Sequence, residues 1–185
     1  QQLLPEAVLS TYDSEESEPF GELQSLLAWA DVVCMGSGLG RSETSEKLVK
    51  MVWEQNEKPC VLDADGLNIW SGFSETERMM HKASYVFTPH VKEMERVSGN
   101  SVASIKENRK EILEKFVDKY NVCTVLKDSR TLVAGKEQQI YMNISGNASM
   151  AKAGAGDVLA GVIAGIMAQG VTPYEAATLG VYLHG

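Results

Sequence analysis

A glycine-rich turn, one carboxylate and a long apolar run follow one another between Ala153 and Gly170. The first backbone N–H groups of a helix have no intrahelical partner, and the helix dipole is positive at that end, so phosphate binds well there. Gly154 and Gly156 lack the Cβ atoms that would hold a phosphate away from the backbone. The run therefore predicts an anion-binding helix start that contains a carboxylate, Asp157.

Two interpretations of Asp157 fit this spacing equally. The carboxylate can act as a base beside the anion, or it can be the N-cap of the helix, since Asp is a favoured capping residue. Apolar residues at four-residue spacing, among them Val158, Val162 and Ile166, predict a helix whose broad apolar face packs on a sheet. The run is shorter than the roughly 20 residues that a membrane span needs, which argues against a membrane segment.

Polar or glycine-rich segments also follow four predicted strands. The strands begin near Asp31, Pro59, Ser84 and Val122, and the segments after them are 36–40, 63–68, 88–90 and 127–131. Ligands of α/β proteins gather at the carboxyl ends of strands. Together with the anion-binding helix start, these strand ends predict an α/β enzyme that handles phosphate.

Each segment has a structural alternative. Lys127 and Thr131 can hold a nucleotide phosphate, or Lys127 can face solvent. His90 can touch a substrate or cap the helix that follows, and the sequence slightly favours the cap. The turn at 36–40 lacks the G-x-G-x-x-G spacing, so it is a weak dinucleotide signal; it is either a close approach to a ligand or a plain strand-to-helix turn.

Two aspartates end the second predicted strand. Asp63 and Asp65 point to opposite sides if the chain is extended there, so we do not expect them to share one metal ion. One of them can face the site, or one can cap a strand-end turn. The three histidines have no accompanying ligand pattern, and we predict no zinc site.

Strand-like runs alternate with helical patterns, which indicates a parallel sheet covered on both faces. The helical patterns cover about residues 44–54, 91–98 and 103–120, and a further one begins at Pro173. Two more strands, from Thr131 and from Gln139, are separated by Gly-Lys-Glu and predict a hairpin, so the sheet is mixed at that edge. We expect a single α/β domain.

Composition limits the function classes. The net charge of −8 and the absence of a dense Lys/Arg stripe argue against nucleic acid as a partner. Acidic residues cluster within 13–22, where we expect a solvated loop. The three cysteines lie in or beside apolar strand-like runs, so we predict buried, reduced thiols and a cytoplasmic protein.

The two ends of the sequence suggest a fragment. The chain starts with Gln and stops at His184-Gly185, within a helical pattern. We expect residues 1–185 to be one domain that is truncated at both ends.

Five segments in this order resemble one family. They are LDADGLN, FTPHVKEMERVSG, VLKDSRT, GNASMAKAGAGDVLAGVIAGIMAQG and AATLGVYLHG. The chain from about Asp31 to Gly185 resembles the ADP- or ATP-dependent NAD(P)H-hydrate dehydratases of the ribokinase-like superfamily. The resemblance implies a three-layer αβα fold with a mostly parallel central sheet and an antiparallel edge hairpin.

The same resemblance implies a function. The family repairs hydrated NADH or NADPH with ADP or ATP as co-substrate: phosphorylation turns the ring hydroxyl into a good leaving group, and phosphate is then eliminated. The resemblance also implies Mg²⁺ as the counter-ion of the phosphates, with no protein ligand assigned. It further implies a homo-oligomer, namely a tetramer. A small-molecule kinase that phosphorylates a hydroxyalkyl heterocycle is the alternative, because it would use the same anion loop and base.

Residue roles carry over by position. Asp157 matches the base, and Gly38, His90 and Asp157 match positions that contact the substrate. The nucleotide-binding positions are matched by Lys127, Asp128, Ser129, Arg130, Thr131, Gly154, Ala155 and Gly156.

Three positions depart from the family pattern. Ser37 stands where the family usually has proline, Val-Lys separates His90 from Glu93 where it usually has Pro-Gly, and Asp128 stands where it often has glycine. Asp128 puts a negative charge near the expected nucleotide phosphates and repels them unless the side chain turns away.

Overall fold

The computed structural model describes residues 7–8, 22–146 and 152–185. Most of the acidic segment within 13–22, and the Gly-Asn-Ala-Ser-Met stretch at 146–150 apart from Gly146, lie outside these residues. The described strands form one six-stranded sheet in the order β1-β2-β3-β4-β5-β6. Their bounds are β1 Val33–Met35, β2 Cys60–Leu62, β3 Tyr85–Phe87, β4 Cys123–Leu126, β5 Leu132–Ala134 and β6 Tyr141–Met142.

The sheet is mostly parallel, as predicted. Strands β1 to β4 are parallel, with Leu62 paired with Met35 on one side and with Phe87 on the other. Strands β5 and β6 continue it as an antiparallel edge, with Val133 opposite Val125 and Tyr141. The carboxyl ends of β1 to β4 therefore lie along one edge of the sheet, which is where the predicted site residues follow the strands.

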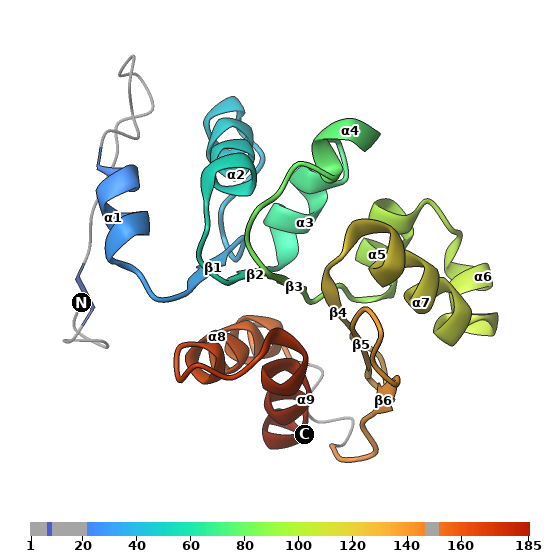
Figure 1. The fold of residues 1–185 in the computed structure, drawn as a ribbon. Helices are drawn as coiled ribbons and strands as arrows, with labels where there is room; N and C mark the ends of the chain where they lie inside the picture. The colour runs from blue at the N-terminus through green and yellow to red at the C-terminus, as the bar shows by residue number, and fades with distance from the viewer. Residues whose placement is uncertain (1–6, 9–21, 147–151) are drawn as a thin grey trace.

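Helices cover both faces of the sheet, which confirms the three-layer fold (Figure 1). One layer contains most of the helices between β1 and β4, and the other contains α8 and α9. The helices are α1 Leu23–Trp29, α2 Glu43–Gln55, α3 Ala64–Trp70, α4 Glu75–Arg78, α5 Val91–Ser98, α6 Val102–Glu107, α7 Arg109–Tyr120, α8 Ala155–Met167 and α9 Pro173–His184.

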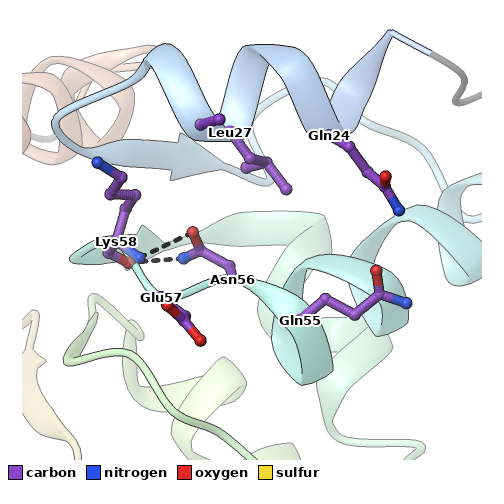
Figure 2. Close-up of a pocket in the computed structure, with 7 residues that line it drawn as sticks. Gln24, Leu27, Gln55, Asn56, Glu57 and Lys58 are labelled. Atoms are coloured by element: carbon purple, nitrogen blue, oxygen red, sulfur yellow. Dashed lines mark hydrogen bonds between the residues drawn. The ribbon is translucent and has the colours of Figure 1, made fainter.

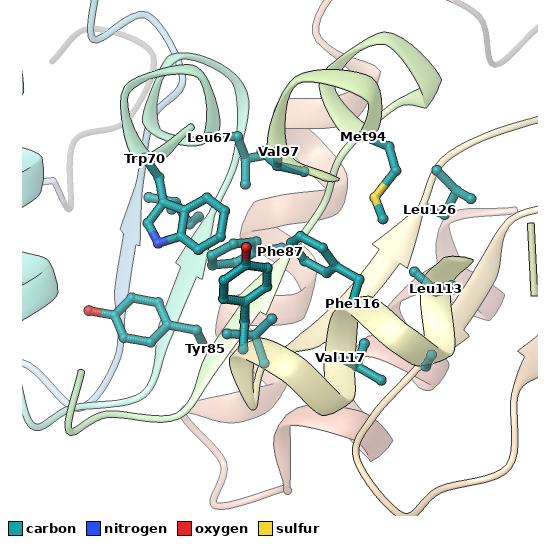
Figure 3. Close-up of a cluster of buried hydrophobic side chains, with 14 of the residues drawn as sticks. Leu67, Trp70, Tyr85, Phe87, Met94, Val97, Leu113, Phe116, Val117 and Leu126 are labelled. Atoms are coloured by element: carbon teal, nitrogen blue, oxygen red, sulfur yellow. The ribbon is translucent and has the colours of Figure 1, made fainter. Parts of the chain in front are cut away.

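Each face of the sheet has its own core because successive strand residues point to opposite sides. Tyr85 and Phe87 pack with Trp70 and Phe116 on the side of α3 and α7, as Figure 3 shows. Val86, between the two aromatic residues, packs instead with α8 and α9. The aromatic core is dense: the Trp70 ring lies 5.0 Å from Phe87 and 5.1 Å from Tyr120.

The predicted helix over 103–120 is interrupted. Asn108 leaves the helical conformation, with φ −126° and ψ 37°, and separates α6 from α7. A helix also begins at Ala64, directly after β2, where the sequence indicated a turn. Both differences arise at junctions where packing between elements, rather than residue periodicity, sets the direction of the chain.

Candidate active site

Helix α8 begins at the carboxyl edge of the sheet. Gly154 is its N-cap, in the left-handed conformation with φ 85°, so the second and third helical residues are Gly156 and Asp157. Helix geometry gives the N–H groups of these two residues no intrahelical acceptor. The beginning of α8 therefore has the form of the predicted anion site.

Asp157 is not the helix cap. It is the third residue of α8, it is exposed, and its carboxylate has no hydrogen bond or ion pair with another described residue. The capping interpretation was therefore wrong for this residue. A carboxylate that no described residue binds, next to backbone N–H groups that lack intrahelical acceptors, is able to accept a proton from a bound substrate.

Lys127 follows β4 and is directed to this helix start, not to open solvent. Its Nζ donates a hydrogen bond to Asp63 Oδ1 at 2.8 Å. A Cβ added to Gly156 would lie 3.2 Å from the Lys127 Nζ and 3.6 Å from Asp63 Oδ2. The structure thus brings the ends of β2 and β4 together with the first turn of α8.

Asp63 is the residue in this group that sequence reasoning left unassigned. It occupies the N-cap position of α3, but its side chain makes no capping hydrogen bond and pairs with Lys127. Asp65 points elsewhere: its Oδ2 accepts a hydrogen bond from Gly40 N at 3.0 Å. The two carboxylates therefore have separate partners, although the extended chain on which the prediction depended ends before Ala64, where α3 begins. The pairing of Asp63 with a lysine 64 residues away has no local sequence signal.

The loop at 127–131 is held by a residue of α7. Arg109 Nη1 lies 3.4 Å from Asp128 Oδ2 and 3.3 Å from the carbonyl oxygen of Arg130. Within the loop, Asp128 Oδ1 accepts from Ser129 N, and Thr131 Oγ1 donates to Asp128 O. The Arg109 guanidinium therefore offsets the negative charge of Asp128. This is the charge, at a position where the family often has glycine, that was expected to repel the nucleotide phosphates. Sequence reasoning missed Arg109.

His90 caps α5. Its Nδ1 accepts hydrogen bonds from Lys92 N and Glu93 N, and Glu93 Oε2 accepts one from His90 N, which completes a capping box. Because Nδ1 is an acceptor, the neutral ring carries its proton on Nε2. The side chain is half-exposed. Its Nε2 lies 3.4 Å from Glu93 Oε1, so this nitrogen also faces the cap. The described contacts of His90 are thus those of the structural interpretation, and its contact with substrate stays a prediction.

The Gly36–Gly40 turn approaches protein backbone at one position. Gly36 has φ 124°, and a Cβ there would collide with the carbonyl oxygen of Asp63. Gly38 is different: it is exposed, with φ 67°, and nothing lies within 4 Å of its missing Cβ. The close contact of this turn is thus with the residues that follow β2, while Gly38 remains accessible to a ligand.

The prediction of three buried thiols was wrong for Cys34. Cys60 and Cys123 are buried, whereas Cys34, on the edge strand β1, is exposed. Partial desolvation, followed by the nearby charges of Asp63 and Asp157, raises the pKa of Cys34 to about 11. The burial prediction failed because β1 has a paired neighbour on one side only among the described strands.

Mg²⁺ has no preformed cage within the described part of the chain, which contains no group of three or more His, Cys, Asp or Glu residues suited to a metal ion. Asp63 is paired with Lys127, and Glu93 completes the cap of α5. Mg²⁺ is commonly held by one or two carboxylates together with substrate phosphates. The residues therefore fit an ion that is bound mainly through nucleotide phosphates.

A hollow of about 270 Å³ lies elsewhere, between α1 and the turn after α2 (Figure 2). Leu27 lines it on one side and residues 55–58 on the other. Asn56 closes the turn by hydrogen bonds with the backbone of Lys58. These residues precede β2, so the hollow is at the opposite edge from the candidate site.

No helix among the described residues is long and apolar enough to cross a membrane.

Comparison with known proteins gives consistent results. A family model described as NAD(P)H-hydrate dehydratase matches residues 1–185. The chain is 41% identical over 182 residues to the ADP-dependent (S)-NAD(P)H-hydrate dehydratase of Neisseria meningitidis, covering 98% of this chain and 59% of the relative. It is 40% identical over 182 residues to the bifunctional NAD(P)H-hydrate repair enzyme Nnr of Moorella thermoacetica, covering 98% of this chain and 34% of the relative.

A solved structure supports the same assignment. The ADP/ATP-dependent NAD(P)H-hydrate dehydratase of Bacillus subtilis, co-crystallized with ATP/Mg²⁺, superposes with a TM-score of 0.74 at 28% identity, over 84% of this chain and 53% of that one. A ribokinase-like superfamily protein of Enterococcus faecalis superposes with a TM-score of 0.76 at 31% identity, over 90% of this chain and 57% of that one. The chain thus spans between about a third and three fifths of the length of these relatives. It belongs to the NAD(P)H-hydrate dehydratase family and has the ribokinase-like fold.

Proposed function

We propose that the protein containing this chain dehydrates hydrated NADH or NADPH at the expense of ADP or ATP. The observation that carries the proposal is the start of α8, where an accessible Asp157 carboxylate follows two backbone N–H groups that lack intrahelical acceptors. Lys127 lies against the same turn. A base and an anion site in contact suit phosphoryl transfer to a hydroxyl group.

The chemistry has two stages. Asp157 takes the proton of the ring hydroxyl while the hydroxyl oxygen bonds to the terminal phosphorus of the nucleotide. The bond between that phosphorus and the rest of the nucleotide breaks, which leaves AMP from ADP or ADP from ATP. The lone pair of the ring nitrogen then expels phosphate by cleavage of the C–O bond. Loss of a proton from the adjacent carbon restores the dihydropyridine ring. The backbone N–H groups of α8 stabilise the charge of the transferring phosphoryl group.

The remaining roles follow the family resemblance. Gly38 and His90 are both exposed, which supports assigning them to the hydrated nicotinamide nucleotide. The nucleotide contacts are assigned to the loop 127–131 and to the turn formed by Gly154, Ala155 and Gly156. Mg²⁺ enters with the nucleotide and neutralises phosphate charge.

The decisive assay mixes hydrated NADH with the full-length protein, ADP or ATP, and Mg²⁺. We expect recovery of reduced-nicotinamide absorbance together with stoichiometric release of phosphate. No recovery would contradict the proposal. Accumulation of a phosphorylated alcohol from a hydroxyalkyl heterocycle, without dehydration, would identify a kinase instead.

We also propose a cytoplasmic homotetramer. The free thiols of Cys60 and Cys123 suit a reducing compartment. Large apolar side chains of α8 and α9 are exposed, among them Val158 at 59%, Tyr182 at 60% and Leu183 at 67%, and such a face suits self-association. Light scattering of the full-length protein should give four chains per particle; a monomeric mass would contradict the assembly.

A further inference from the structure

An ion pair crosses the sheet beneath the first turn of α8. Lys127 follows β4 and Asp63 follows β2, yet their side chains meet at 2.8 Å across the intervening strand β3. The Asp63 side chain is 3% exposed and that of Lys127 is 20% exposed. An enclosed pair of this kind is weak evidence for net stability, because desolvation offsets the attraction. A role in positioning accounts for it better.

Helix α8 is fitted around this pair. Gly156 does not have a positive φ, so its backbone conformation does not require glycine. A Cβ there would lie 3.2 Å from Lys127 Nζ, so the ammonium group would have to shift by a few tenths of an ångström. The missing side chain at Gly156 therefore lets the ammonium group lie against the helix start without that shift.

A buried hydroxyl lies on the same face of the sheet. Val61 and Val86 belong to the core beside α8, and residues two positions further along extended strands, Asp63 and Thr88, share that face. Thr88 is fully buried, and its Oγ1 has no hydrogen-bond partner among the described residues. A buried polar atom without a partner is costly, so this position suits an additional oxygen atom from water or a ligand.

We propose that Asp63 is a positioning residue that holds the Lys127 ammonium against the start of α8, so that Lys127 and the N–H groups of Gly156 and Asp157 act on one phosphoryl group. The inference rests on the proposed function. The positive end of α8 repels a nearby ammonium group, and the Asp63 carboxylate counters that repulsion. Asp63 thus acts through Lys127 and touches neither substrate nor nucleotide.

A double-mutant cycle in the full-length enzyme tests this. Asp63→Asn should lower kcat about a hundredfold, the scale of a misplaced reacting group, and change the KM for nucleotide by less than about threefold. In a Lys127→Ala background, Asp63→Asn should cost no further activity. Activity losses that multiply in the double variant would overturn the proposal. So would a raised Mg²⁺ requirement caused by Asp63→Asn in both backgrounds, because Asp63 would then be a metal ligand.

Two further variants define the origin of the effect. Gly156→Ala should lower kcat in the wild-type background and less in the Lys127→Ala background, where the space is open. Equal losses in both backgrounds would overturn the fitting argument. The matched control is Glu111→Gln, which breaks an exposed ion pair with Lys115 on α7, and it should leave kcat unchanged.

A stability measurement separates this inference from the proposed function, because it needs no dehydratase activity. Lys127→Ala leaves the buried Asp63 carboxylate without its partner, so adding Asp63→Asn should raise the denaturant midpoint above that of Lys127→Ala alone. An equal or lower midpoint would overturn the pairing. If the midpoints shift as expected but hydrated NADH is not consumed, the positioning pair stands and the proposed function fails.

Discussion

Asp157 differs from the other acidic residues of the site in having no structural partner among the described residues. Asp63 pairs with Lys127, Asp128 with Arg109, and Asp65 with Gly40 N and Arg41. The Asp157 carboxylate can therefore accept a proton without breaking a contact with a described residue. The residue type was evident from the sequence, but its freedom from a capping role was not.

Asp157→Asn should lower turnover of hydrated NADH by roughly a hundredfold or more, from the usual scale of general-base loss, while nucleotide affinity is largely kept. Asn has nearly the same shape but is not a base. Steady-state kinetics and nucleotide titration of the same variant measure both quantities. Undiminished turnover would show that Asp157 is not the base.

Cys34 should be accessible but slow to react. Its pKa of about 11 leaves about one thiol in a thousand ionised at pH 8, and only the thiolate is nucleophilic. Because the pKa is raised, alkylation by iodoacetamide should speed up about tenfold per pH unit between pH 7 and 10. Mass spectrometry should find Cys34 labelled before the buried Cys60 and Cys123. A rate that levels off near pH 9, the ordinary pKa of a thiol, would contradict the raised pKa, and Cys34→Ser provides the control.

At the scale of elements, the loop 127–131 and helix α7 form one unit. Arg109 is the first residue of α7, where a positive side chain opposes the helix dipole. Its contacts with Asp128 and with the carbonyl oxygen of Arg130 explain its presence there. The loop after β4 is therefore held by a helix that precedes β4 in sequence.

Arg109→Ala should raise the KM for nucleotide several-fold with a smaller change in kcat, since it loosens the loop and uncovers the Asp128 charge. Asp128→Gly combined with Arg109→Ala should recover part of that affinity, because the uncompensated carboxylate is gone. Steady-state kinetics with varied nucleotide measures KM and kcat of both variants. An unchanged KM in Arg109→Ala would show that α7 does not shape the loop.

At the scale of the whole molecule, an aromatic cluster joins the sheet to α2, α3 and α7. Trp70 is fully buried and packs edge-on against Phe87 and Phe116, while the Trp53 ring contacts Trp70 at 5.7 Å. Asp63 lies directly before α3, the helix that carries Trp70. Packing of this cluster therefore sets the position of α3, and with it the end of β2.

Trp70→Ala should reduce the free energy of unfolding by about 3–5 kcal/mol, the usual range for removing a buried aromatic side chain. Urea denaturation followed by circular dichroism measures the loss. Trp29→Ala is the matched control, because Trp29 on α1 is 81% exposed, and it should change stability by less than about 0.5 kcal/mol. A loss below about 1 kcal/mol for Trp70→Ala would contradict the role of the cluster.

The sequence by itself determined the αβα fold, the mixed edge of the sheet and a helix that starts at the glycine-rich turn before Val158. Strand alternation, helical periodicity and the glycine pattern are local properties, and they are sufficient for these features. The helix at Val91–Ser98 was predicted with the observed bounds for the same reason. The break at Asn108 was missed, because periodicity continues across it while the chain changes direction to pack.

Only the tertiary structure decided which side chains meet at the site. Two contacts join residues that are distant in sequence: Asp63 with Lys127, and Arg109 with Asp128. The exposure of Cys34 likewise depends on which strands lie beside β1. The order of strands in the sheet creates these neighbours, and no spacing within a motif encodes that order. The sequence pointed to Asp157, Lys127 and Gly156 as separate candidates. Because the ends of β2 and β4 and the start of α8 meet at one edge of the sheet, Lys127 and Gly156 lie beside Asp63, in the turn that contains Asp157.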